Sequence, residues 1–486
     1  MSHLIRDPLM AASVNAARGR RTRSPRWWGW LGAAVVPFLL ASCTAYHARP
    51  LAPADAIGAS ASADLVQVAV SAATLKHPLL APMTVNVADG LTPDEAALLA
   101  VAANPDLRAA RAARGVAEAQ LVAAGILPNP QISGAVDVPV RHTANTVDAV
   151  SLGAAIDLLG IATRGAEQDA ARRGLQSVDL GVAWLEWQVA QSVRLRVYDV
   201  MLVERARTLS MQQERGLEAT VTTLRAAVAK QVATRVELGA AEVAYRTVIS
   251  ARITLDMQRD TARVSLARAV GVDEASLPPI QETPVPFDGD SSLAFAQEVP
   301  TLQELMKEFG SRRLDLQGLR FGYLSQEARV RAAVIRQFPQ INVGVNRIRD
   351  TGNLLTLGPA ATLFFPLFNR NQGEIAVARA TRSQLKAEYD ARVFDTRATV
   401  QILLAELSST VKRLQNLRAS VGVQQQTVEL YRRALQGGNA DVLTYYTVRS
   451  DLMNRQLEVV ATLRNLVELA IALETETGTR FTSSTR

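Results

Sequence analysis

Two segments of the chain alternate apolar and polar residues with a period of two, and each is soon followed by a second segment of the same kind. The first pair covers about residues 129–141 and 147–158, and the second pair covers about residues 338–348 and 354–365. Such alternation places apolar side chains on one face of a β-strand and polar side chains on the other. The pattern therefore predicts two β-hairpins, each with an apolar face.

Each predicted β-hairpin is followed by a long segment without proline. Residues 161–270 and 369–475 are rich in Ala, Leu, Arg, Gln and Glu, which are strong helix formers. Each segment is interrupted once, at Val232–Leu238 and at Gln436–Leu443, so we expect two long helical hairpins. The stretch from Ile161 to Lys230 would form a helix of about 105 Å. A helix of that length has to pack laterally against other helices, as in a coiled coil.

Local signals indicate where the helices of the second hairpin begin and end. Asn369 is expected to cap the helix that follows the Phe364–Phe368 corner, and Glu374 lies in its first turn. Gly437 and the glycine after it predict the end of that helix. We expect Asn439 to cap the next helix.

The order helix, two strands and long helical hairpin occurs twice in the predicted elements. Pro130-Gln131-Ile132 recurs 209 residues later as Pro339-Gln340-Ile341, and each triplet follows a predicted helix. We therefore expect an internal duplication. The expected domains after the N-terminal region are a first repeat at 90–270, a proline-rich linker at 271–300, a second repeat at 301–475 and a C-terminal tail at 476–486.

The N-terminal region has the pattern of a bacterial export signal. Residues 1–42 begin with arginines and end in an uncharged apolar run, and the signal could start at Met1 or Met10. Leu40-Ala41-Ser42-Cys43 resembles the lipoprotein processing site, at which the signal is cut and the cysteine receives lipid. The alternative is a short membrane anchor with an incidental cysteine. We expect lipidation at Cys43, followed by an extended tether over residues 43–89.

Composition excludes several function classes. The net charge is +7, but six arginines and one aspartate in residues 1–42 supply +5 of it, so no basic stripe is left for nucleic acid. The single cysteine and the scattered histidines do not form a metal site. No nucleophile, acid–base pair or cofactor motif stands out, so we expect neither an enzyme nor a cofactor.

Four strands with an apolar face cannot close into a barrel by themselves, since about eight strands are the smallest useful number. Strands of about ten residues do match a tilted crossing of an outer membrane. We therefore expect strands from several copies to be pooled. Ile341 and Val343 should then face lipid, while Asn342 and Asn346 should face water.

With these features the sequence resembles the outer-membrane efflux protein family, the TolC-like exit ducts. The resemblance covers roughly residues 90–475 and rests on Asn104-Pro105-Asp106-Leu107, on the corner Pro366-Leu367-Phe368-Asn369-Arg370 and on the turn Asp441-Val442-Leu443. It implies a mainly α-helical chain with a small β part. It also implies a homotrimer in the outer membrane, with a 12-stranded β-barrel continued by a long periplasmic α-helical barrel.

The resemblance further implies partners and a gate. The partners are outer-membrane lipid, a periplasmic adaptor protein and an inner-membrane transporter, and the duct would export substrates passively. By position in the motifs, the periplasmic gate would comprise Arg235, Glu237, Asn439, Asp441 and Tyr445. Val236 could take the place of Glu237, and all of these residues could instead be ordinary helix caps and exposed side chains.

Two other functions fit part of the sequence. A coiled-coil envelope lipoprotein that forms no channel would explain the helices but leave the amphipathic strands unused. An exit duct for protein secretion would use the same architecture for a different cargo.

Overall fold

The computed structural model describes residues 46–51, 65–141, 145–288 and 300–481. The chain divides into two units, Met1–Ala56 and Ile57–Arg486. In the first unit, the described residues 46–51 are exposed and form neither helix nor strand. The predicted signal sequence 1–42 and the predicted lipidation site Cys43 lie outside the described residues.

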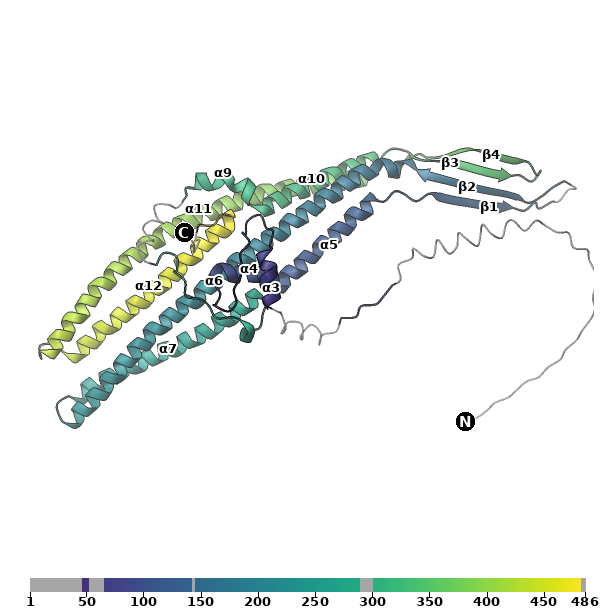
Figure 1. Cartoon of the computed structure of the whole chain (residues 1–486). Coiled ribbons are helices and arrows are strands. Elements are labelled where there is room, and N and C mark those ends of the chain that lie inside the picture. Colours follow the sequence, from purple (N-terminus) through teal and green to yellow (C-terminus); the bar gives the residue numbers. More distant parts are fainter. Residues whose placement is uncertain (1–45, 52–64, 142–144, 289–299, 482–486) are drawn as a thin grey trace, which may run out of the picture. The chain divides into compact units, whose positions relative to one another are not determined.

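The described part of the second unit combines long helices with a small sheet (Figure 1). In chain order its elements are α3 (Leu65–Ala73), α4 (Pro93–Ala103), α5 (Pro105–Gly125), β1 (Gln131–Asp137), β2 (Ala149–Asp157), α6 (Leu158–Ala229), α7 (Arg235–Val270), the 3-10 helix η1 (Glu274–Ser276), α9 (Leu302–Arg312), α10 (Leu314–Ile335), β3 (Gln340–Arg349), β4 (Leu355–Phe364), α11 (Gln372–Gln436) and α12 (Val442–Thr477). The order helix, two strands and helical hairpin occurs twice within the described residues, as α5 to α7 and as α10 to α12.

Among the described residues, the strands form one antiparallel sheet in the order β1-β2-β3-β4. The β2–β3 pairing joins the two hairpins, with Ile156 opposite Val343 and Ala155 opposite Gly344. A Cβ atom on Gly344 would overlap the carbonyl oxygen of Ala154 and lie 2.7 Å from Ala155 Cα. The close approach of β2 and β3 therefore requires a glycine at this position.

The long helices pack side by side. α5 packs on α6, α6 on α10 and α10 on α11, while further along α6 also packs on α7 and α12, and α12 packs on α11. α6 has 72 residues and is therefore about 108 Å long. α5 and α7 lie at one side of this layer and α11 lies at the other.

Buried leucines fill the space between the helices. Leu407 and Leu414 of α11 pack in one core cluster with Leu463 and Leu466 of α12, each 1% exposed or less. Within the part of the chain that the structure describes, no helix carries an apolar stretch long enough to cross a bilayer.

Two predicted N-caps were wrong by two residues. Asn371, at a positive φ of 59°, precedes α11, and Asn369 instead accepts a hydrogen bond from the Asn371 N–H through its side-chain oxygen. Asp441, not Asn439, caps α12. Asn371 makes no side-chain hydrogen bond to the start of α11, whereas Asp441 accepts one from the Thr444 N–H. Sequence preference alone does not locate a helix end to the residue.

The prediction of an extended tether over residues 43–89 was wrong for α3, which is a helix of nine residues. Its Ala72 is buried in a cluster with Trp187 of α6, so packing holds this segment on the helices. The predicted tail at residue 476 also starts too early, because α12 continues to Thr477 and ends at Gly478, whose φ of 68° suits a glycine.

Candidate functional site

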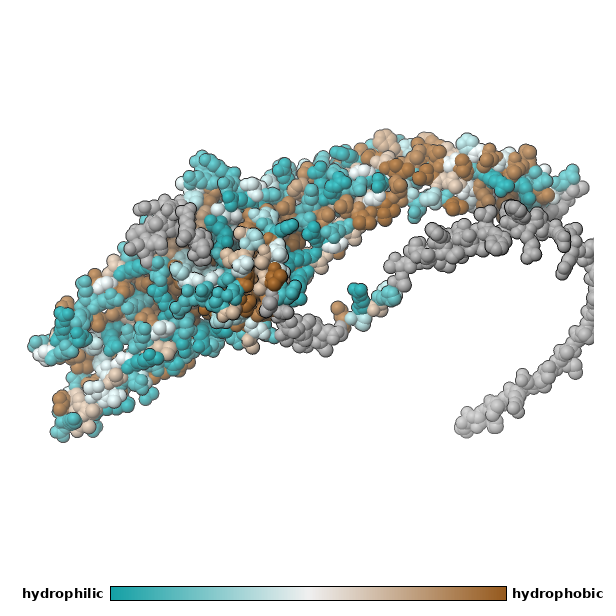
Figure 2. All heavy atoms as spheres, in the orientation of Figure 1, coloured by the Kyte–Doolittle hydropathy of each residue, from teal (hydrophilic) through white to brown (hydrophobic). Residues whose placement is uncertain are grey.

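The sheet has an apolar face and a polar face. On β3, Ile341, Val343 and Val345 are exposed on one face, and Asn346 lies on the other. The hydrophobic surface seen in Figure 2 gathers over the strands and the helix ends beside them. An exposed apolar surface of this kind marks contact with a membrane or with protein.

Asn342 does not face open water, as the alternation predicted, because only 7% of its surface is exposed. It lies opposite Asp157, where β2 passes directly into α6, and α6 packs on β3. The prediction for Asn342 was therefore wrong. Alternation fixes which face of the sheet a residue occupies, but not what covers that face.

Exposed apolar residues line the end of the sheet where β3 begins and β4 ends, and we call them the collar. Phe364, Phe365 and Leu367 are exposed, and Phe368 is 92% exposed. Phe338 adds to the collar just before β3. In proteins that cross membranes, aromatic side chains concentrate at the lipid headgroup region, because their rings are apolar with a polar edge or tip.

At the far end of the first helical hairpin, the chain reverses through residues 230–234, which we call the first reversal. Thr234 caps α7, and its N–H and hydroxyl donate hydrogen bonds to Glu237 Oε2 at 2.7 and 2.9 Å. The Glu237 N–H donates back to Thr234 Oγ1 at 3.2 Å. The carboxylate of Glu237 is thus engaged in a capping box. Arg235 is exposed.

At the far end of the second hairpin, the chain reverses through residues 437–441, which we call the second reversal. The Thr444 N–H and hydroxyl both donate to Asp441 Oδ2 at 3.1 Å. These hydrogen bonds, above all the one from the Thr444 N–H, lower the pKa of Asp441 below 3.8, so its carboxylate stays charged near neutral pH. Asn439 is exposed, and Tyr445 packs edge-on against Tyr446.

The structure therefore places the five predicted gate residues within the second reversal or in the first turn of the helix that follows each reversal. Among the described residues of this single chain, no hydrogen bond or ion pair joins Arg235 or Glu237 to Asn439, Asp441 or Tyr445. Glu237 completes the capping box of α7 and Asp441 caps α12, and these contacts are compatible with a further role between copies of the chain.

Sequence reasoning missed the residues that do connect the two hairpins near the reversals. Tyr446 is 6% exposed and packs in one cluster with Leu217 of α6 and Ala241 of α7. Arg449 Nε donates to Gln213 Oε1 at 3.3 Å. A signal for Tyr446 does exist, because Met453 and Val460 follow it at intervals of seven residues, the spacing of a buried helix seam.

A buried ion cluster ties the middle of the helices together. Arg194 of α6 is 2% exposed and lies between Asp94 of α4, at 2.9 Å, and Glu474 of α12. Arg480 pairs with Asp94 from the other side. Burial disfavours the charge of Arg194, but Glu474 and Asp94 outweigh it and raise its pKa. Removing one member of such a cluster costs about 3–5 kcal/mol, because it leaves a buried charge without its partner.

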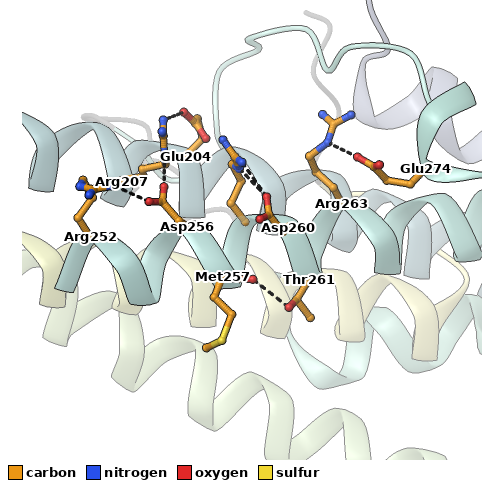
Figure 3. Close-up of polar contacts among 10 residues, drawn as sticks. Glu204, Arg207, Arg252, Asp256, Met257, Asp260, Thr261, Arg263 and Glu274 are labelled. Carbon is orange, nitrogen blue, oxygen red and sulfur yellow. Dashed lines mark hydrogen bonds and ion pairs between the residues drawn. The ribbon is translucent and has the colours of Figure 1, made fainter. Parts of the chain in front are cut away.

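α7 binds α6 through ion pairs and leaves an apolar stripe free. Asp256 lies 2.6 Å from both Arg207 of α6 and Arg252, and Arg263 lies 3.0 Å from Glu274 (Figure 3). Met257 points away from these pairs in Figure 3. It belongs to an exposed stripe on α7 made up of Val243, Ile253, Met257 and Val264.

The described residues hold no group of three or more His, Cys, Asp or Glu side chains placed to bind a metal ion. His77 is buried against α6, where its Nε2 lies 2.8 Å from the Ala183 carbonyl oxygen. Its Nδ1 accepts hydrogen bonds from the N–H groups of Leu79 and Leu80. This histidine fixes the segment after α3 onto the helices.

Comparison with known proteins gives a family match in the second repeat. Residues 305–479 match the family model of outer membrane efflux proteins. These residues form an outer membrane efflux protein domain. The match includes β3, β4, α11 and α12, with the apolar face, the collar and the second reversal.

Solved structures share the fold of this efflux protein domain and of the first repeat. CusC, described as forming a transmembrane channel, is 17% identical and has a TM-score of 0.66 over 83% of this chain and 98% of its own. The outer membrane protein VceC of Vibrio cholerae is 17% identical, with a TM-score of 0.64 over 79% and 96%. The MtrE outer membrane channel of Neisseria gonorrhoeae is 17% identical, with a TM-score of 0.59 over 83% and 94%. At this identity the likeness concerns the fold. No curated protein matches the sequence.

Proposed function

We propose that this chain is the outer-membrane exit duct of a tripartite efflux pump and that it works as a homotrimer. Three copies would pool their strands in a 12-stranded barrel in the outer membrane, and their helices would continue the barrel into the periplasm. The duct would conduct substrates passively, without catalysis. The efflux protein domain at residues 305–479 supports this proposal.

The observation that carries the proposal is a sheet with an exposed apolar face and two open edges. In the described part of the chain, β1 pairs only with β2, and β4 pairs only with β3. Open strand edges cannot stay unpaired in lipid, because no water is present to satisfy their N–H and C=O groups. Pairing β1 of one copy with β4 of the next would satisfy both edges.

The sides of the helical layer fit the same arrangement. On α11, Ile402, Val423 and Leu430 are exposed and lie at multiples of seven residues, which is the spacing of a coiled-coil seam. On the opposite side of the layer, α7 carries its own exposed apolar stripe, including Met257 and Val264. We propose that α11 of one copy packs on α7 of the next.

The N-terminal region would add a lipid anchor at Cys43. The proposal of lipidation rests on the sequence pattern Leu40-Ala41-Ser42-Cys43. Intact mass of protein extracted from membranes measures it directly. A mature chain that starts elsewhere, or that carries no acyl mass, contradicts the proposed lipid anchor. The proposed channel function does not depend on this result.

A periplasmic adaptor and an inner-membrane transporter would complete the pump. Within the described part of Ile57–Arg486, the helical reversals lie at the ends of the long helices away from the sheet, with α6 extending about 108 Å from its junction with β2 (Figure 1). We propose that the adaptor meets the duct at these reversals.

Light scattering in detergent and single-channel recording in planar bilayers test the proposed function together. We expect a trimeric mass and stable, water-filled conductance. A monomer that inserts no channel under conditions that keep its helices folded contradicts the proposal. It would favour a coiled-coil envelope protein instead.

A further inference from the structure

Two arginines interrupt the apolar face of the sheet at the end away from the helices. Along β3 the residues of this face are Ile341, Val343, Val345, Arg347 and Arg349, at every second position. Both arginines are exposed. The apolar face of β3 therefore changes from aliphatic to cationic over the last three residues of the strand.

The neighbours of these arginines on both adjoining strands are aliphatic. Arg347 lies opposite Leu152 of β2 and Leu357 of β4. Arg349 lies opposite Val150 and Leu355. Leu357 is 77% exposed, so this part of the face is open. Each arginine is thus flanked on both neighbouring strands by apolar side chains on the same face of the sheet.

Within the described residues, neither guanidinium lies within 4 Å of a carboxylate. Arg349 Nη2 donates to the backbone oxygen of Asp148 at 3.3 Å. The nearby Asp350 uses its Oδ1 atom to accept the Gly352 and Leu354 N–H groups, both at 2.9 Å, which closes the β3–β4 turn. The described residues of one chain therefore supply no carboxylate partner for Arg347 or Arg349.

The position of the arginines matches the outer headgroup level of a membrane. From Phe364 in the collar to Leu355 opposite Arg349 is nine residues, or about 30 Å of strand. With a strand tilt of about 40°, this span crosses roughly 23 Å, close to the height of the apolar band of outer-membrane barrels. An arginine at the midplane would cost about 2–4 kcal/mol, but one at the headgroup level costs little.

Pairing between copies leaves this surface open. β3 is flanked by β2 and β4 of the same chain, so it does not form the seam with another copy. Arg347 and Arg349 are two residues apart on one face, which places their Cα atoms about 7 Å from each other. Two guanidinium groups at that spacing can both reach a headgroup that carries phosphate.

We propose that Arg347 and Arg349 bind the phosphate groups of the outer-leaflet glycolipid, the lipid A part of lipopolysaccharide. The inference rests on the proposed function, which puts this end of the sheet at the outer surface. Guanidinium groups bind phosphate through paired, charge-assisted hydrogen bonds. The aliphatic neighbours would contact the acyl chains of the same lipid.

The test is a titration of the purified full-length trimer with lipid A and with the same lipid after enzymatic removal of its phosphates, followed by native mass spectrometry. Arg347→Gln/Arg349→Gln should bind lipid A about thirtyfold more weakly, at roughly 1 kcal/mol for each arginine. Removal of the phosphates should weaken binding to the unaltered protein by a similar factor. Arg172→Gln/Arg320→Gln removes two exposed arginines from α6 and α10 and should bind like the unaltered protein.

Three outcomes overturn the inference: equal binding of the two lipids, full binding by Arg347→Gln/Arg349→Gln, or equal affinity of the unaltered protein for phosphatidylglycerol. Light scattering confirms that each variant is trimeric, and Arg347→Lys/Arg349→Lys, which keeps the charge, should bind with intermediate strength. Conductance is recorded in parallel and should be the same for all variants. If the unaltered protein conducts ions but binds both forms of lipid A equally, only the lipid site is refuted. If the unaltered protein does not conduct ions, the proposed function is refuted.

Discussion

At the scale of single residues, His77 shows how one side chain can hold a segment in place. Both ring nitrogens are engaged, with Nδ1 accepting two N–H groups and Nε2 next to the Ala183 carbonyl oxygen. Burial lowers the pKa of His77 below 6.5. The Ala183 carbonyl and Glu186, 3.7 Å away, act in the opposite direction, and Arg111 acts with burial. The neutral ring is the form that fits this site.

We expect the segment around His77 to loosen in acid. A histidine whose pKa is lower in the folded state contributes stability above the unfolded value and loses it as pH falls through the folded value. Hydrogen-exchange protection of the Leu79 and Leu80 amides should therefore fall as the pH is lowered below about 6.5. His77→Gln should remove the pH step, and His47→Gln, at an exposed site, should keep it. Constant protection over this range in the unaltered protein would contradict the expectation.

Gly344 shows how strongly one position can control the sheet. Gly344→Ala should prevent the normal β2–β3 pairing, because the added Cβ would overlap the Ala154 carbonyl oxygen. We expect a loss of at least about 1–3 kcal/mol in stability. Gly358→Ala on the neighbouring strand is the matched control, since nothing lies within 4 Å of its added Cβ. The thermal midpoint of the trimer in detergent measures both, and equal midpoints would show that β2 and β3 can move apart freely.

At the scale of elements, the two helical reversals combine capping with the charge proposed for the gate. Asp441 holds the first turn of α12 through Thr444. Replacement by alanine would remove the charge and the cap together. Asparagine caps a helix as well as aspartate does, so Asp441→Asn removes the charge alone.

We predict that Asp441→Asn lowers the preference of the channel for cations while the trimer stays as stable as before. The reason is that a ring of three carboxylates in a pore attracts cations. Because the pKa of Asp441 is below 3.8, the unaltered channel should keep this preference down to about pH 4. Reversal potentials in a salt gradient measure it. If Asp441→Asn and the unaltered channel are equally selective, Asp441 is a cap and nothing more.

At the scale of the whole molecule, the described chain leaves apolar surface on both sides of its helical layer. Ile402 and Val423 of α11 belong to one of these surfaces. Ile402→Glu/Val423→Glu should prevent trimer formation, since it would bury charge in every contact between copies. Thr399→Glu/Gln425→Glu adds the same charge at exposed positions of α11 outside this apolar surface and should leave the trimer intact. Light scattering in detergent separates the results, and trimers in both variants would exclude α11 from the contact.

Local patterns in the sequence were enough to predict the four strands and the two helical hairpins in their correct order. Period-two alternation and long proline-free segments are local signals, and β1 to β4 and the helical hairpins lie where these signals predict them, within a few residues. The reversals were found for the same reason, since Gly437 and Thr234 act through their own backbone neighbours. The exact first residue of a helix was harder to predict. Asn369 and Asn371 have the same preference for the N-cap position, and the backbone conformation places Asn371 there.

Contacts between residues far apart in the sequence depend on how the elements pack together. The cluster of Asp94, Arg194 and Glu474 joins positions up to 380 residues apart, and no local pattern links them. The burial of Asn342 depends on α6, and the contact of Arg449 with Gln213 depends on how two hairpins lie together. Local periodicity fixes the face that each residue presents, whereas packing between elements fixes what that face touches, and the ion cluster and Asn342 depend on packing.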